Sequence, residues 1–105
     1  MKPISPIICL EELKLGNNRI VDVSPLSSLK SLKTLLLGGN LIASLEGLAL
    51  PSLVELDLSN NLIKSLKPLH NMQQLQELKV NNNLLKCLRG IESLQNLQHL
   101  MCYSN

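Results

Sequence analysis

The chain has 105 residues and a mass of 11.6 kDa, which corresponds to one domain with little room for an enzyme's pocket and its supporting residues. Leucine supplies 27 positions, whereas Trp and Phe are absent and Tyr occurs once, so we expect a core that reuses one packing unit. Ten basic residues against eight acidic ones give a net charge of +2, too small a surplus to predict binding to nucleic acid or an anionic membrane.

Targeting segments and disulfides are not evident in the sequence. No apolar run approaches the roughly 18 residues that a membrane span requires, and residues 1–10 lack the apolar stretch and cleavage site of a signal peptide. The three cysteines, Cys9, Cys87 and Cys102, are odd in number and show no CxxC spacing. This usage favours free thiols in a reducing compartment, so we expect a cytoplasmic or otherwise intracellular protein.

One phrase recurs along the whole chain. The pattern LxxLxLxxN occupies residues 10–18, 32–40, 53–61, 75–83 and 97–105, with Val80 and Cys102 as the only replacements at its third apolar site. Its closing asparagines lie 22, 21, 22 and 22 residues apart, at Asn18, Asn40, Asn61, Asn83 and Asn105. Such regularity indicates a repeat architecture, which decides the fold before any local structure does.

Each phrase predicts a short strand followed by a turn. The LxL part gives two inward side chains at period two, as a strand requires. A single repeat cannot bury its own leucines, so neighbouring repeats must stack and their strands must pair in parallel. The asparagine stands where the chain leaves the strand, and its amide can both donate to and accept from backbone groups of adjacent repeats. We therefore assign the five asparagines a structural role.

The segments that return from one strand to the next are less regular. Pro25 and Pro68 occupy the same repeat position and would hinder a long helix there. We therefore expect short 3₁₀ or single-turn helical segments. Residues 88–97 contain no proline, and the sequence favours a true helical turn there.

The two ends of the chain do not match complete repeats. Residues 1–9 read as a partial leading repeat, followed by repeats at 10–31, 32–52, 53–74 and 75–96 within a single domain over 1–105. Residues 97–105 read as a terminal strand without the polar cap that solenoids need. Leu97, Leu100 and Cys102 would then be covered on one side only. This predicts a tendency to self-associate through residues 97–105.

This pattern resembles the leucine-rich repeat family over essentially the whole chain. The 22-residue length and the phrase NxIxxLxxLxxLxx look most like the short intracellular subclass typified by the protein phosphatase type-1 regulatory subunit. The resemblance implies an α/β solenoid: a right-handed superhelix with a concave parallel sheet of about five short strands and 3₁₀ or short helical convex segments. It also implies an asparagine ladder, and proteins that bind other proteins without catalysis.

Candidate binding residues are the strand positions that flank the inward leucines, together with Tyr103. They are Glu12, Lys14, Thr34, Leu36, Glu55, Asp57, Glu77, Lys79, His99, Met101 and Tyr103. Leu36, Met101 and Tyr103 are large apolar or aromatic residues where water is expected, as at interface anchors, although isolated exposed residues of this kind are also ordinary. Five acidic and three basic residues on these strands, counting the residue after each first leucine, suit a basic or mixed-charge protein partner.

A second group of charges recurs outside the strands. Lys64, Lys67, Lys86 and Arg89 hold matching positions in the third and fourth repeats and predict a small basic patch on the turn side. Such a patch could meet an acidic partner or serve as a solvated surface that aids solubility.

The sequence contains no recognisable catalytic or metal-binding constellation. His70 and His99 hold different repeat positions, and HExxH, CxxC, P-loop, GxGxxG and GxSxG motifs are absent. We therefore predict no enzyme activity, no cofactor and no nucleic-acid partner. Two functions stay open: a protein–protein interaction scaffold that binds a partner on its concave sheet, or a structural fragment or self-associating module whose uncapped ends stack.

Overall fold

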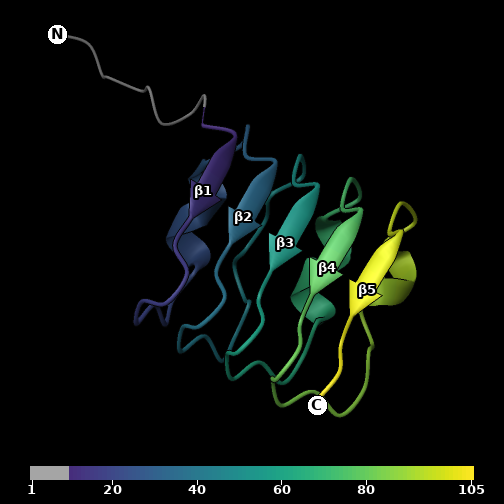
Figure 1. Ribbon diagram of the computed structural model, residues 1–105. Coiled ribbons are helices and arrows are strands. Elements are labelled where there is room, and N and C mark those ends of the chain that lie inside the picture. The colour runs from purple at the N-terminus through teal and green to yellow at the C-terminus, as the bar shows by residue number, and fades with distance from the viewer. Residues whose placement is uncertain (1–9) are drawn as a thin grey trace, which may run out of the picture.

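The computed structural model describes residues 10–105, so the partial repeat expected over residues 1–9 lies outside the described residues. Five three-residue strands form one sheet in chain order (Figure 1). They are β1 (Glu12–Lys14), β2 (Thr34–Leu36), β3 (Glu55–Asp57), β4 (Glu77–Lys79) and β5 (His99–Met101). Each strand pairs in parallel with the strand of the next repeat, so the predicted leucine-repeat solenoid is confirmed.

Three short 3₁₀ segments lie behind the sheet in Figure 1: η2 (Ser24–Ser28), η3 (Lys67–Asn71) and η4 (Ile91–Ser93). Pro25 and Pro68 stand at the start of the first two, where a missing N–H costs nothing. The prediction of a true helical turn over residues 88–97 was wrong, because only the three-residue 3₁₀ segment η4 forms there. It follows Gly90, whose φ of 110° is not helical, and the Leu94 N–H bonds back only three residues, to the Ile91 carbonyl at 2.9 Å.

The core consists of the inward side chains of consecutive strands, stacked in register. Leu35 pairs with Leu56 and Leu56 with Leu78, and all three have an exposed fraction of 0%. Full burial of one such side chain stabilises the fold by about 1.5–3 kcal/mol. In the outer repeats Leu13 and Leu100 are only partly buried, because each has a neighbouring repeat on one side within the described chain.

The closing asparagines join each repeat to the one before it. The Oδ1 of Asn40 accepts hydrogen bonds from the backbone N–H groups of Asn18 at 3.1 Å and Ile20 at 3.0 Å. Its Nδ2 donates to the carbonyl oxygens of Leu15 at 3.0 Å and Leu37 at 2.8 Å. One amide therefore satisfies backbone groups in two repeats at once.

The same bond recurs down the solenoid. The N–H groups of Ile42, Ile63 and Leu85 donate to the Oδ1 atoms of Asn61, Asn83 and Asn105, respectively. The ladder residues of the inner repeats are only 5–6% exposed, whereas those of the first and last phrases are exposed. In the described part of the chain no buried side-chain nitrogen or oxygen lacks a partner. The interior polar groups are thus satisfied by the ladder.

The residue before each ladder asparagine has a left-handed backbone. The φ values are 57° for Asn17, 75° for Gly39, 59° for Asn60, 57° for Asn82 and 61° for Ser104. Only glycine and, at lower cost than other residues, asparagine or aspartate visit this region routinely. In each repeat this left-handed residue turns the chain after the strand and directly before the ladder asparagine.

We expect Asn61→Ala to destabilise the protein by about 1–3 kcal/mol, because it leaves the buried Ile42 N–H unpaired. The Leu37 and Leu58 carbonyls each lose one hydrogen bond but keep a second one, from Asn40 and Asn83 respectively. Asn18→Ala is the matched control. The Asn18 amide donates to carbonyls of its own exposed turn, so its loss should cost about 1 kcal/mol or less. Urea unfolding followed by circular dichroism measures both, and equal costs would contradict the role of the buried ladder.

We expect Gly39→Ala to destabilise the protein by about 1–2 kcal/mol, because alanine is strained at a φ of 75°. Its added Cβ would also collide with the Asn17 Oδ1. Gly38→Ala is the adjacent control, since a Cβ there lies 3.4 Å from the Ser59 carbonyl oxygen, an ordinary contact. Thermal melting of the two variants should separate them, and a similar fall in Tm for both would argue against strain at Gly39.

Candidate protein-binding face

The face of the sheet that points away from the core carries two continuous columns of side chains, which we call the sheet face. Strand pairing places the first column at Glu12, Thr34, Glu55, Glu77 and His99. The second column holds Lys14, Leu36, Asp57, Lys79 and Met101. The columns match the alternation expected from sequence. Their members are half-buried in the three inner strands and exposed on β1 and β5.

Two of the cations on the sheet face are paired within their own strands. Lys14 Nζ lies 3.5 Å from Glu12 Oε2, and Lys79 Nζ lies 3.7 Å from Glu77 Oε2. The carboxylates of the central strand β3, Glu55 and Asp57, have no cationic partner within 4 Å among residues 10–105. Asp57 Oδ1 accepts only the Ser59 N–H, at 3.0 Å. Negative charge is therefore left free at the centre of the sheet face.

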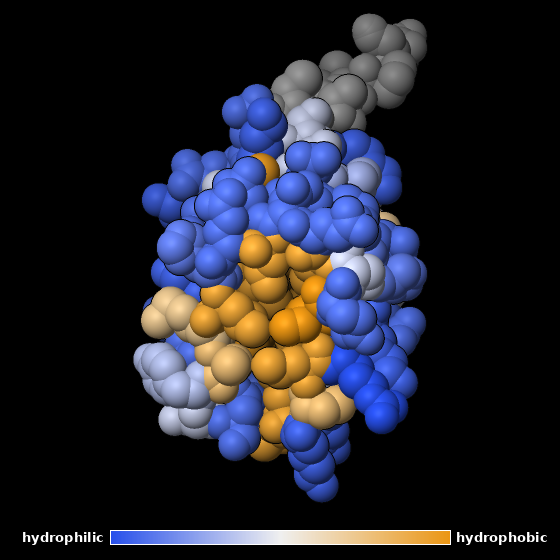
Figure 2. Space-filling model, turned by 90° about the vertical axis from the view of Figure 1, so that its right-hand side faces the viewer, coloured by the Kyte–Doolittle hydropathy of each residue, from blue (hydrophilic) through white to orange (hydrophobic). Residues whose placement is uncertain are grey.

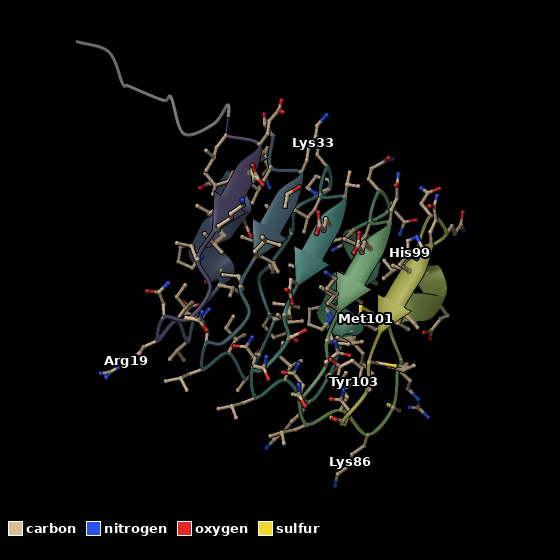
Figure 3. The ribbon with its side chains drawn as sticks, viewed as in Figure 1. Arg19, Lys33, Lys86, His99, Met101 and Tyr103 are labelled. Atoms are coloured by element: carbon tan, nitrogen blue, oxygen red, sulfur yellow. The ribbon has the colours of Figure 1, made fainter. Side chains whose placement is uncertain are left out.

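Apolar side chains lie on the neighbouring strand β2 and, two strands away, on β5, whereas Lys79 of β4 is the register neighbour of Asp57. Leu36 is half-buried on β2, in direct register with Asp57. Met101 and Tyr103 are 41% and 61% exposed, and Figure 3 shows them one after the other along and beyond β5. The Tyr103 N–H donates to the Asn81 Oδ1 at 2.9 Å, which ties this segment to the fourth repeat. The sheet face thus offers free carboxylates with flanking apolar contacts.

The four residues of the predicted basic patch have two kinds of neighbour. Lys64 and Lys86 line a depression of about 400 Å³ together with Leu84. Lys67 and Arg89 instead lie near the exposed carboxylate of Glu92. The pKa of Glu92 is lowered chiefly by hydrogen bonds from its own and the Gly90 backbone N–H groups, and further by these two cations.

Sequence reasoning missed one set of exposed residues. Leu41, Leu62 and Leu84 follow the ladder asparagines of the second, third and fourth repeats and are 47%, 43% and 47% exposed. The signal was present in the sequence, because each stands between two buried positions and must point outward by alternation.

The remaining polar chemistry shows no convergent site. Within residues 10–105 there is no group of three or more His, Cys, Asp or Glu side chains that could hold a metal ion. His70 Nδ1 contacts the Lys67 carbonyl oxygen at 2.9 Å, and Cys87 and Cys102 are free thiols. The pKa of Asp22 is lowered by hydrogen bonds from the Ser24 N–H and then its hydroxyl, a local turn interaction. No helix in the described part is long and apolar enough to cross a membrane.

Comparison with protein families decides the assignment. A model described as leucine-rich repeats in two copies matches residues 10–50, 30–71 and 51–93. The chain belongs to the leucine-rich repeat family. Leucine-rich repeat proteins generally act as protein-interaction scaffolds. A search of curated protein sequences found no match.

Solved structures show the same architecture. An internalin from Listeria monocytogenes is 34% identical and superposes with a TM-score of 0.87 over 99% of this chain. An internalin C2 from the same organism is 29% identical, with a TM-score of 0.86 over 95% of this chain. The chain spans 32% of the first protein and 46% of the second. These likenesses concern the leucine-rich repeat part of longer proteins.

Proposed function

We propose that this leucine-rich repeat protein is a non-catalytic scaffold that holds a protein partner against its sheet face. The observation that carries the proposal is the pair of free carboxylates on the central strand, Glu55 and Asp57, beside the half-buried Leu36. Charged groups left free on a rigid sheet are available to a partner at little ordering cost, because the parallel pairing already fixes their backbone. The family's general use as an interaction module supports the same function.

The chemistry of the sheet face defines the kind of partner. A lysine or arginine side chain placed over β3 would meet two carboxylates, while an adjacent apolar side chain would cover Leu36. On β5, Met101 and Tyr103 add a second apolar contact of the type that is enriched at interface cores. The proposed partner is therefore a protein segment of basic or mixed charge that also carries apolar residues.

Two finer parts of the proposal rest on the sequence. The free thiols Cys87 and Cys102 support an intracellular location. The 22-residue repeat supports a role like that of the phosphatase-regulatory subclass, although Tyr103 is the only aromatic residue in the chain. Neither part is needed for the binding mode on the sheet face.

We expect Glu55→Lys to lower the retention of a sheet-face partner by about tenfold or more, because it places like charge opposite the partner's cation. Glu46→Lys is a charge-matched control, since Glu46 is exposed and lies outside the strands. Immobilised wild type and both variants, checked for native circular dichroism, are compared by pull-down from lysate and mass spectrometry. Proteins lost equally from both variants would place binding elsewhere, as would retention that is unchanged by Glu55→Lys.

The surface at the β5 end favours a second candidate function, self-association by stacking. Val23, Leu45 and Leu66 are 0–1% exposed, whereas Leu88 at the same repeat position is 37% exposed. Leu97, Leu100 and Cys102 are likewise only partly buried. Figure 2 views the molecule from the side of β5 and shows an apolar area surrounded by polar groups. Burial of this area would be favourable at about 25 cal/mol per Å², before the cost of association.

If the ends stack, the sedimentation coefficient of the wild type should rise with protein concentration, and Leu88→Lys should abolish the rise. The lysine would place an unpaired charge in the contact. Val21→Lys is the control, because Val21 is 61% exposed and lies in the first repeat, away from the β5 end. A wild type that stays monomeric at all concentrations would rule out stacking, and so would a Leu88→Lys variant that associates as the wild type does.

A further inference from the structure

The loops that follow the strands carry an exposed aliphatic column, which we call the leucine stripe. Its members are Leu41, Leu62 and Leu84, each 43–47% exposed and each set between a buried ladder asparagine and a buried Ile or Leu. Single exposed leucines are ordinary on protein surfaces. Three at one repeat position, in consecutive repeats, instead form a continuous apolar surface.

Backbone hydrogen bonds hold this stripe in register. The N–H of Leu41 donates to the Ile20 carbonyl at 2.9 Å, and the N–H of Leu62 donates to the Ile42 carbonyl at 2.8 Å. The N–H of Leu84 donates to the Ile63 carbonyl at 2.9 Å. Successive segments are therefore paired like parallel strands, which places equivalent residues about 4.8 Å apart. These bonds keep the three leucines aligned from one repeat to the next.

The charges around the stripe have one sign. Residues 17–21, 39–43, 60–64 and 82–86 contain the cations Arg19, Lys64 and Lys86 and no Asp or Glu. Arg19 holds the repeat position of the stripe in the first repeat. Lys64 and Lys86 lie two residues after Leu62 and Leu84. Lys64 and Lys86 enclose the depression beside Leu84. A partner that covers the leucines would thus find cations and no opposing carboxylates on these segments.

This surface is separate from the sheet face. In Figure 3, Arg19 and Lys86 both extend from the loops beyond the ends of the strands, whereas Lys33 lies at the opposite edge of the molecule. The sheet face leaves negative charge free on β3, whereas the four segments 17–21, 39–43, 60–64 and 82–86, which we call the loop edge, contain cations and no Asp or Glu. A single partner segment is not complementary to both surfaces.

The spacing of the stripe selects the form of the partner. The stripe extends over two spacings between neighbouring repeats, from Leu41 to Leu84, which is about 9.6 Å. Two turns of an α-helix cover about 10.8 Å, whereas two side-chain repeats of an extended strand cover about 13.2 Å. A helix laid across the loops therefore keeps three successive leucines in contact with a mismatch of about 1 Å, against about 4 Å for a strand.

We propose that the loop edge is a second docking surface, which binds an acidic amphipathic α-helix of a partner protein. Leucines at helix positions i, i+4 and i+7 would pack between Leu41, Leu62 and Leu84, as in other helix-in-groove complexes. Glutamates that flank the apolar face would pair with Lys64 and Lys86. This inference goes beyond the proposed function, because it does not depend on any ligand of the sheet face.

The test uses a stapled helical peptide with leucines at i, i+4 and i+7 and glutamates beside them. Its two comparison peptides are one of equal composition with leucines dispersed around the helix, and one with lysines in place of the glutamates. Fluorescence anisotropy gives the affinity, and amide chemical shifts of the labelled protein locate the site. We expect only the patterned acidic peptide to bind, with the largest shifts at Leu41, Leu62 and Leu84.

Variants of the protein separate this surface from the sheet face. Leu62→Gln should weaken binding of the patterned peptide by about tenfold, as is typical of a central interface contact. The double variant Lys64→Glu, Lys86→Glu should lose the acidic peptide and gain affinity for the lysine peptide. Leu36→Gln, a matched change on the sheet face, should leave binding unchanged.

Several results would overturn the proposal. Equal binding of the patterned and dispersed peptides would show that charge alone is recognised. Equal losses for Leu62→Gln and Leu36→Gln would place the peptide on the sheet face or reflect a general change in the fold, and urea unfolding of both variants would identify which. Binding of phosphatidylserine vesicles by a protein that does not bind the peptide would make the loop edge a lipid-binding surface instead.

Discussion

Each of the four repeats that begin at residues 10, 32, 53 and 75 depends on an asparagine side-chain amide supplied by the repeat after it. Because the Asn40 amide satisfies groups at Asn18, Ile20 and Leu15, the first repeat cannot complete its own hydrogen bonding. The same holds for Ile42 and Asn61 one step further along. The strand leucines show a matching requirement, since those of the three inner strands are fully buried whereas Leu13 and Leu100 of the outer strands are only partly buried. Stability is therefore shared between neighbours.

Because the core and the asparagine ladder use only inward side chains, the outward positions are available for binding. The strand positions beside the inward leucines and the loop positions beside the ladder asparagines take no part in the core, so their residue types are not set by folding. Two surfaces of opposite character result: free carboxylates at Glu55 and Asp57 on the sheet face, and Lys64 and Lys86 beside the leucine stripe at the loop edge. A rigid solenoid with two such surfaces would hold two different partners at a fixed separation.

The return segments show where reasoning from sequence was incomplete. Pro25 and Pro68 correctly indicated short 3₁₀ segments, but the absence of proline from residues 88–97 wrongly favoured a helical turn. The backbone of Gly90, with its φ of 110°, and the need to reach the next strand within one repeat decided the outcome. The leucine stripe was overlooked for a different reason: alternation already places Leu41, Leu62 and Leu84 outward, but the candidate binding residues were sought only on and just beyond the strands.

The sequence by itself determined the repeat, the strands, their parallel order and the side-chain columns of the sheet face, because a strict period in apolar residues permits only one way to stack them. Tertiary structure alone decided which charges are paired: Lys14 and Lys79 lie against glutamates of their own strands, while Glu55 and Asp57 have no such partner among the described residues. It also decided how large an exposed fraction Leu41, Leu62 and Leu84 retain. These properties depend on distances between individual side chains, which periodicity does not contain.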